Sequence, residues 1–184
     1  MRRIAIATGT RADWGLLSGI ARELDARPDC HVMVIATNMH LSPRYGNTVD
    51  EIIADGFTPA ATVDMKIDEA DASTVATVGM MARCMEGMAE ALDRLRPDLL
   101  VILGDRFEML ATASAALMMR VPIVHIAGGE ISEGAVDDSI RHAITKMASL
   151  HLTATEPYRQ RVIAMGESPD RVINTGAIGV YNIL

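Results

Sequence analysis

Seven short apolar runs alternate with helical stretches along almost the whole chain. The runs are rich in aliphatic and β-branched residues, and between them apolar residues recur every three or four positions. The expected strands are residues 3–8, 30–37, 60–65, 99–103, 121–127, 150–155 and 171–174. This alternation predicts an α/β fold with a doubly wound, mostly parallel sheet of about seven strands. The 184 residues are enough for one such domain.

The longest expected helix covers residues 73–96 and has Pro97 directly after it. Apolar residues recur along it at alternating spacings of three and four, which is the pattern of a buried or partner-facing stripe. The stripe consists of Val78, Met81, Met85, Met88, Leu92 and Leu95. A stripe of this kind usually packs on the core of its own domain. Part of it could instead contact a second subunit, so a homo-oligomer is expected.

Composition excludes several classes of protein. The net charge is −7, aromatic residues make up 3%, and the arginines are scattered, so nucleic-acid binding is not expected. No apolar run is long enough to span a membrane. The two cysteines, Cys30 and Cys84, lack the spacing of a metal site and are interpreted as buried thiols in a reducing compartment. The sequence therefore predicts a cytoplasmic protein with no metal.

Polar residues follow the first two expected strands. Arg11 lies in the turn after the first strand, where it could clamp an anion at a helix N-terminus or be an exposed loop residue. His40 follows the second strand and could reach a cleft or remain solvated. The first turn contains Gly9 and Gly15 but no GxGxxG, which argues against a nicotinamide enzyme.

Acidic residues follow two later strands, within the stretch that runs from Val101 to residue 133 and just beyond it. Asp105 comes after the fourth strand, and Glu130, Asp137 and Asp138 come after the fifth. One alternative is structural, because Asp105 and Glu108 have the spacing of a helix capping box and the later acids could stabilise a helix N-terminus. The carboxyl ends of parallel strands share one edge of the sheet, and this convergence favours a site.

Four motifs occur in the order of a known family. They are TGTRAD at 8–13, LGDRFE at 103–108, HIAGGE at 125–130 and DDSIRHAITK at 137–146. The chain closely resembles the hydrolysing UDP-N-acetylglucosamine 2-epimerases over its whole length. The resemblance implies the first half of a glycosyltransferase-B-type fold, in which two Rossmann-like domains enclose the active site. Residues 1–184 would form one such domain, and the second, nucleotide-binding domain would be absent, so the chain alone is expected to have little activity.

The family's reaction needs acids and bases but no metal or redox cofactor. A base removes the C2 proton of the sugar, UDP leaves from C1, and water adds to the resulting glycal to give N-acetylmannosamine. The resemblance makes Asp105 the first candidate for this acid/base work, with Glu130 and Asp137 next. Arg11 would hold phosphate or position the sugar of the nucleotide-sugar substrate. Supporting contacts are expected from Asp13, His40, Arg106 and Asp138.

One position departs from the family pattern. Several members carry a carboxylate with a catalytic role where this chain has Ala127, and others carry His. Either Glu130 takes that role or the substrate branch differs. The alternatives to a hydrolysing enzyme are a non-hydrolysing 2-epimerase, which would release a nucleotide sugar, and a sugar-binding module without catalysis.

Overall fold

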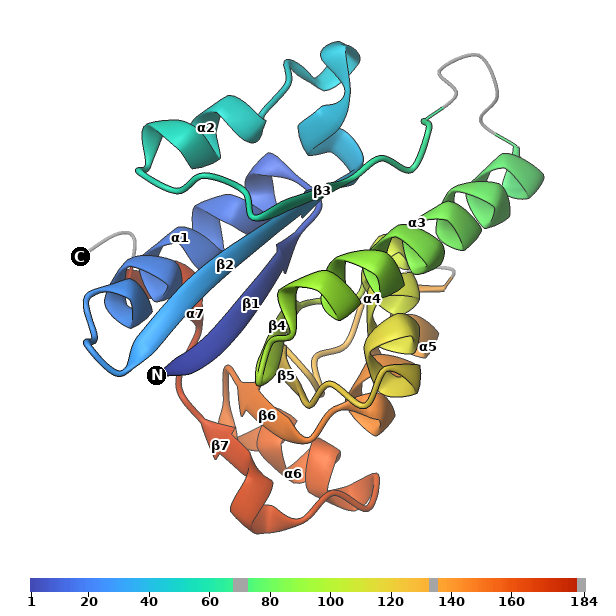
Figure 1. Cartoon of the computed structure of the whole chain (residues 1–184). Helices are drawn as coiled ribbons and strands as arrows, with labels where there is room; N and C mark the ends of the chain where they lie inside the picture. Colours follow the sequence, from blue (N-terminus) through green and yellow to red (C-terminus); the bar gives the residue numbers. More distant parts are fainter. Residues whose placement is uncertain (68–72, 133–135, 182–184) are drawn as a thin grey trace.

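A computed structural model of the chain describes residues 1–67, 73–132 and 136–181. Within these ranges seven strands form one parallel sheet in the order β3-β2-β1-β4-β5-β6-β7. The order reverses beside β1, because the chain leaves β3 at one side and re-enters the sheet as β4 on the other (Figure 1). The doubly wound α/β fold expected from the sequence is confirmed.

The bounds of the elements follow the sequence pattern closely. The strands are β1 (Arg2–Thr8), β2 (Cys30–Thr37), β3 (Ala61–Val63), β4 (Leu99–Leu103), β5 (Ile123–Ile126), β6 (Leu150–Thr153) and β7 (Val172–Asn174). The helices are α1 (Arg11–Asp25), α2 (Val49–Ala54), α3 (Thr74–Leu95), α4 (Phe107–Met118), α5 (Asp137–Met147), α6 (Glu156–Ala164) and α7 (Ile178–Tyr181). Short 3-10 turns occupy Asn38–Leu41, Pro43–Tyr45 and Pro169–Arg171.

Each face of the sheet has its own apolar core. Helices α3, α4 and α5 cover one face, where Met88, Met109 and Ile144 are fully buried (Figure 1). Helices α1 and α2 cover the other face, where Trp14 and Ile52 pack against the sheet. Because consecutive side chains of a strand point to opposite faces, strands buried on both sides read as continuous apolar runs. This is why the strands could be predicted from the sequence.

Backbone geometry explains why two of the elements are shorter than expected. Residues 45–55 also have the sequence pattern of a short helix, but the helix is reduced to α2 because Gly46 and Asn47 both have left-handed φ angles, of 82° and 48°. Strand β5 ends one residue before Ala127, which also has a left-handed φ of 66°. A left-handed residue cannot continue a strand or a helix. Residues 66–72 are rich in charged residues and lack apolar periodicity, which predicts a loop, and part of this segment lies outside the described residues.

Helix α3 presents its apolar residues to two different surroundings. Met88 and Leu92 are buried in the core, and Met81 and Leu95 pack against it. Val78 and Met85, which the sequence pattern assigned to the same stripe, are exposed. Of the two alternatives for the stripe, packing on the core of its own domain therefore does not hold for Val78 and Met85, because the core also uses Cys84 and the buried seam turns away from them.

Two further expectations concern the thiols and the membrane. Cys84 is buried as expected, whereas Cys30, at the start of β2, is half-buried, so the interpretation of both as buried thiols was wrong for Cys30. Burial raises the pKa of the Cys84 thiol to about 11. Among the described helices none has the length and apolar character needed to cross a membrane.

Candidate active site

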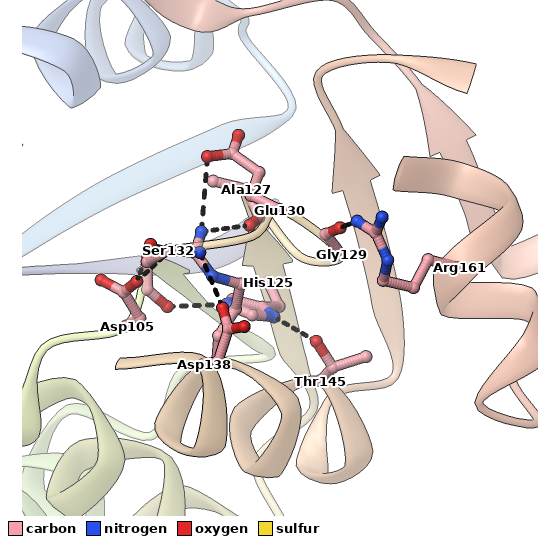
Figure 2. A network of polar contacts seen from close by, with 11 residues as sticks. Asp105, His125, Ala127, Gly129, Glu130, Ser132, Asp138, Thr145 and Arg161 are labelled. Carbon is pink, nitrogen blue, oxygen red and sulfur yellow. Dashed lines mark hydrogen bonds and ion pairs between the residues drawn. The ribbon is translucent and has the colours of Figure 1, made fainter. Parts of the chain in front are cut away.

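A buried arginine on α5 gathers the acids that follow β4 and β5. The side chain of Arg141 is 5% exposed and forms ion pairs with Asp105 and, at 3.4 Å, with Glu130. It also donates hydrogen bonds to the Ala127 carbonyl at 3.0 Å and to the Ser132 hydroxyl at 2.6 Å. Figure 2 shows Asp105, Ala127, Glu130 and Ser132 gathered at one edge of the sheet. We call Arg141, Asp105, Glu130 and Ser132 the Arg141 cluster.

Sequence reasoning identified the two acids but missed Arg141. In the motif DDSIRHAITK, Arg141 reads as a basic residue that balances the preceding acids on an exposed helix. It lies, however, next to Ile140 and three positions before Ile144, and both isoleucines are buried. This helical spacing places Arg141 at the margin of the buried face. The signal was therefore present in the periodicity of α5, although periodicity alone does not reveal what a buried cation contacts.

The loop after β5 is held in place from the other side by α6. Gly129 has a φ of 77°, and a Cβ atom there would lie 2.4 Å from the Tyr158 carbonyl oxygen. Arg161 of α6 donates a hydrogen bond to the Gly129 carbonyl. Glycine is thus required both by the backbone conformation and by the close approach of α6. The double glycine of the sequence motif serves packing, and Glu130 follows it with a fixed backbone.

A buried histidine fixes the turn that carries Asp105. His125 of β5 is fully buried, with Nε2 2.8 Å from the Gly104 carbonyl and Nδ1 3.1 Å from the Thr145 hydroxyl. Burial lowers its pKa from 6.5 to about 4, so the ring is neutral at pH 7. Because a carbonyl only accepts, Nε2 carries the proton and donates it to Gly104. His125 therefore joins the ends of β4 and β5 to α5.

A second ion pair lies at the switch point between β1 and β4. Arg106 directs Nε at Glu108, whose Oε1 is 2.5 Å away and whose side chain is fully buried. Helix α4 begins after Arg106, so the capping box proposed for Asp105 and Glu108 does not form. That alternative was wrong because Glu108 turns inward toward Gly9, where a Cβ atom would lie 2.5 Å from its Oε1.

Asp13 belongs to the same buried neighbourhood. Its carboxylate accepts a hydrogen bond from the Gly9 amide at 3.4 Å, and the Thr10 hydroxyl caps α1 by accepting from the Asp13 amide. Burial raises the pKa of Asp13, and the positive charge of Arg106 acts against that rise. Asp13 and Glu108 thus supply negative charge around the guanidinium of Arg106.

A groove of about 760 Å³ opens beside this pair and reaches the first turn of α1. Its lining includes Thr10, Arg11, Thr48 and Arg106. Arg11 is the first residue of α1, and its side chain is 76% exposed while forming a 3.0 Å ion pair with Glu51. We call these lining residues the Arg106 groove. Two cations beside a helix N-terminus suit an anionic ligand.

His40 is neither solvated nor open to this groove. Its ring is fully buried, with Nε2 2.9 Å from the Thr8 hydroxyl and Nδ1 2.8 Å from the Thr48 hydroxyl. Burial lowers its pKa. The alternative of a solvated loop histidine was wrong. His40 supports Thr48, which lines the groove, so its position is that of a supporting residue.

The two acids at the start of α5 have different surroundings. Asp138 accepts a hydrogen bond from the Ser132 amide at 2.8 Å and thereby holds the loop that carries a member of the Arg141 cluster. Asp137 is the first residue of α5, and within the described residues it makes no ion pair with Arg141. Residue 133, part of the same acidic run, lies outside the described residues. No metal-type grouping of three His, Cys, Asp or Glu side chains occurs within 1–67, 73–132 and 136–181.

Solved structures with this fold show what the architecture is similar to. UDP-GlcNAc 2-epimerase from Neisseria meningitidis, bound to UDP-GlcNAc, matches with a TM-score of 0.84 and 18% identity, over 100% of this chain and 48% of that one. The enzyme from Methanocaldococcus jannaschii matches with a TM-score of 0.82 and 19% identity, over 98% of this chain and 47% of the other. The predicted Rossmann-like domain of a glycosyltransferase-B-type fold is confirmed.

Curated relatives are closer in sequence. The UDP-N,N'-diacetylbacillosamine 2-epimerase (hydrolyzing) of Legionella pneumophila is 40% identical over 100% of this chain and 48% of its own length. The UDP-N-acetylglucosamine 2-epimerase of Neisseria meningitidis is 35% identical over 91% of this chain and 43% of its own length. The chain thus spans about half the length of these relatives. Residues 22–184 match the family described as UDP-N-acetylglucosamine 2-epimerase. The chain therefore belongs to the UDP-N-acetylglucosamine 2-epimerase family.

Proposed function

We propose that the chain supplies the sugar-facing half of a hydrolysing nucleotide-sugar 2-epimerase. The observation that carries this proposal is the Arg141 cluster, in which Asp105 and Glu130 meet at the carboxyl edge of the sheet. Two carboxylates held by one buried cation are suited to proton transfer at a carbon atom. The substrate is a UDP-linked 2-acetamido sugar, in keeping with the names of the relatives.

The reaction follows from what two acids can do at one sugar carbon. One carboxylate takes the C2 proton, the electrons of that C–H bond form a C1=C2 double bond, and the bond from C1 to the UDP oxygen breaks. Water then adds across the double bond, with hydroxide at C1 and a proton delivered to the opposite face of C2. The products are free UDP and the 2-epimeric sugar. Asp105 and Glu130 are the acid/base pair, with Asp137, the first residue of α5, as a further candidate.

The rest of the site positions these groups. Arg141 fixes both carboxylates, which are 21% and 32% exposed and so remain open to a ligand. Asp138 holds Ser132, and Ser132 contacts the carboxylate of Asp105 at 3.4 Å. Orientation of this kind supports catalysis because a small displacement of a reacting group slows the reaction strongly.

The diphosphate of the substrate fits the Arg106 groove. Arg11 and Arg106 supply positive charge, and α1 directs its N-terminus at the same space. Asp13 and Glu108 hold Arg106, while His40 holds Thr48. Phosphate groups are bound in this way at helix N-termini. Arg11 and Arg106 are therefore the substrate-binding cations, and Asp13 and His40 are their supports.

Three further features belong to this proposal. Residues 1–184 act as the first domain of a two-domain enzyme whose second domain supplies most contacts to the nucleotide. The enzyme is a dimer or tetramer that associates partly through the exposed apolar side of α3, which carries Val75, Val78 and Met85. The free thiols Cys30 and Cys84 support a cytoplasmic location.

The test joins residues 1–184 to the second half of the Neisseria meningitidis relative and measures UDP release and sugar products. We expect free UDP and free 2-epimeric sugar from the joined protein and little activity from residues 1–184 alone. A nucleotide sugar as product would favour a non-hydrolysing enzyme, and sugar binding without turnover would favour a module that has lost catalysis.

The role of Asp105 has its own test in the joined protein. Asp105→Asn keeps the size of the side chain and removes its basicity, so the rate should fall by about 10²- to 10⁴-fold. Asp170→Asn, at an exposed site remote from the cluster, is the matched control. A loss below about tenfold for Asp105→Asn would contradict a proton-transfer role.

A further inference from the structure

Arg161 of α6 is a partly buried cation that makes no ion pair in the part of the chain that the structure describes. Its guanidinium lies over the ring of Tyr158, 5.6 Å from the centroid, and donates a hydrogen bond to the Gly129 carbonyl. Arg159, on the same helix, has an acidic partner in Glu156 at 3.1 Å. The side chain of Arg161 instead extends toward the loop after β5 (Figure 2).

The loop that Arg161 contacts is packed tightly on both sides. A Cβ atom at Gly129 would lie 2.9 Å from Cγ2 of Val162, in addition to its clash with the backbone of α6. A Cβ atom at Gly128 would lie 3.2 Å from the Thr145 hydroxyl of α5. The two glycines therefore let the loop backbone fit between α5 and α6. Because such close packing leaves little free space, a change on the α6 side is transmitted to the loop.

Glu130 depends on this loop for its position. Within the described residues its carboxylate has one partner, Arg141, at 3.4 Å. This distance is long for a charged hydrogen bond, which is ordinarily about 2.7–2.9 Å. The Gly129 carbonyl, however, belongs to the planar peptide group that also contains the Glu130 nitrogen. A hydrogen bond from Arg161 to that carbonyl therefore fixes the plane from which Glu130 begins.

We infer that Arg161 is a positioning residue of the proposed epimerase, which holds the peptide group before Glu130 and thereby sets the direction of this acid. The inference rests on the proposed function, since it assigns Glu130 to the acid/base pair. Arg161 acts through the loop and not by contact with the sugar. It is also absent from the lining of the Arg106 groove, so its removal should slow the reaction without weakening the binding of the diphosphate.

The first experiment measures kcat and KM of the joined protein described above. Arg161→Met keeps the length of the side chain and removes the hydrogen-bond donor. We expect kcat to fall about 10- to 100-fold, as a small displacement of a reacting group predicts, and KM to change less than about twofold. Gln160→Met is the matched control, because Gln160 is the neighbouring exposed residue of α6 and contacts Glu156. It should retain the kcat of the unchanged protein.

Chemical rescue separates positioning from a general loss of stability. Arg161→Ala opens a space beside Tyr158, and added methylguanidinium should restore part of kcat by donating to the Gly129 carbonyl. Arg161→Lys keeps one donor and should retain more activity than Arg161→Met. Gly129→Ala displaces the loop by a different route, so its kcat should also fall, but methylguanidinium should not restore it.

Several outcomes would overturn the inference. They are an unchanged kcat in Arg161→Met and Arg161→Ala, an equal loss in Gln160→Met, and a rise in KM without a fall in kcat. A fall in kcat that methylguanidinium does not reverse in Arg161→Ala, together with a lower midpoint of urea unfolding, would assign Arg161 to stability alone and would also overturn it. Absence of UDP release by the unchanged joined protein would instead overturn the proposed function, and this inference with it.

Discussion

Arg141 and Arg106 both lie near the carboxyl edge of the sheet, but their side chains differ in how far they are buried. Arg141 is almost completely buried, and its partners are the acids and the carbonyl of its own domain. Arg106 has one buried partner, Glu108, but its side chain is 34% exposed and lines an open groove. A cation enclosed by protein groups orients those groups, whereas a cation that remains accessible can bind a ligand. Under the proposed function, the same edge of the sheet would hold the acid/base pair and the cations that bind the diphosphate.

The largest effect that distinguishes the two should come from removing the buried cation. Arg141→Gln leaves Asp105 and Glu130 without their shared counter-ion, so both acids lose their fixed orientation. In the joined protein the rate should fall by about 10²-fold or more. The free energy of unfolding of residues 1–184 should fall by about 3 kcal/mol, at the lower end for a broken buried pair because the acids are partly exposed.

Arg141→Lys is the matched control for this change. Lysine keeps the charge but cannot direct separate N–H groups at two carboxylates, so an intermediate rate is expected. Steady-state kinetics and urea unfolding measure the two effects. If Arg141→Gln left the rate unchanged, the acids would have to be oriented by other groups, and the distinction drawn between the two arginines would fail.

A smaller effect on stability should come from protonation of His125, which supports the Arg141 cluster. The pKa of His125 is lowered to about 4 by burial, against an ordinary value of 6.5. Between these pH values the unfolded chain binds a proton that the folded chain does not, so stability falls as pH falls from about 6.5 to 4. The full contribution is on the order of 3 kcal/mol.

Urea unfolding of residues 1–184 at a series of pH values measures this contribution. His125→Gln can still donate to the Gly104 carbonyl but cannot take up a proton, so its stability should depend less on pH than that of the unchanged chain. His40 and His151 also have lowered pKa values from burial and leave a residual slope of the same sign. Equal slopes for the two proteins would show that His125 is not held neutral.

The smallest effect on stability should come from a residue of the Arg106 groove. Its effect on the KM for the substrate should nevertheless be clear. Arg11→Ala removes an exposed ion pair with Glu51, which contributes at most about 1 kcal/mol to stability. The KM for the nucleotide sugar should nevertheless rise about tenfold, as loss of one charged hydrogen bond to phosphate predicts, while kcat changes little. Glu51→Gln, which frees Arg11, is the control and should not raise KM. A fall in kcat alone would contradict a binding role.

The fold was predictable because strands that are buried on both faces of the sheet appear in the sequence as continuous apolar runs. The seven strands and the convergence of Asp105 and Glu130 followed from that pattern. Three properties of the site did not. The periodicity of α5 places Arg141 at the margin of the buried face but does not show its partners, nothing marks Ala127 as left-handed, and Glu108 has the spacing of a cap although it is buried. Each depends on contacts between segments distant in sequence, which no local pattern records.

The contact between α6 and Gly129 has a consequence for how this part of the molecule can move. The same helix reaches the other way through Arg159, whose Nε donates to the Val172 carbonyl at 2.8 Å in the last strand of the sheet. Helix α6 therefore holds both the loop that leads to Glu130 and the last strand of the sheet. A displacement of α6 would move the loop that carries Glu130 and the strand β7 together.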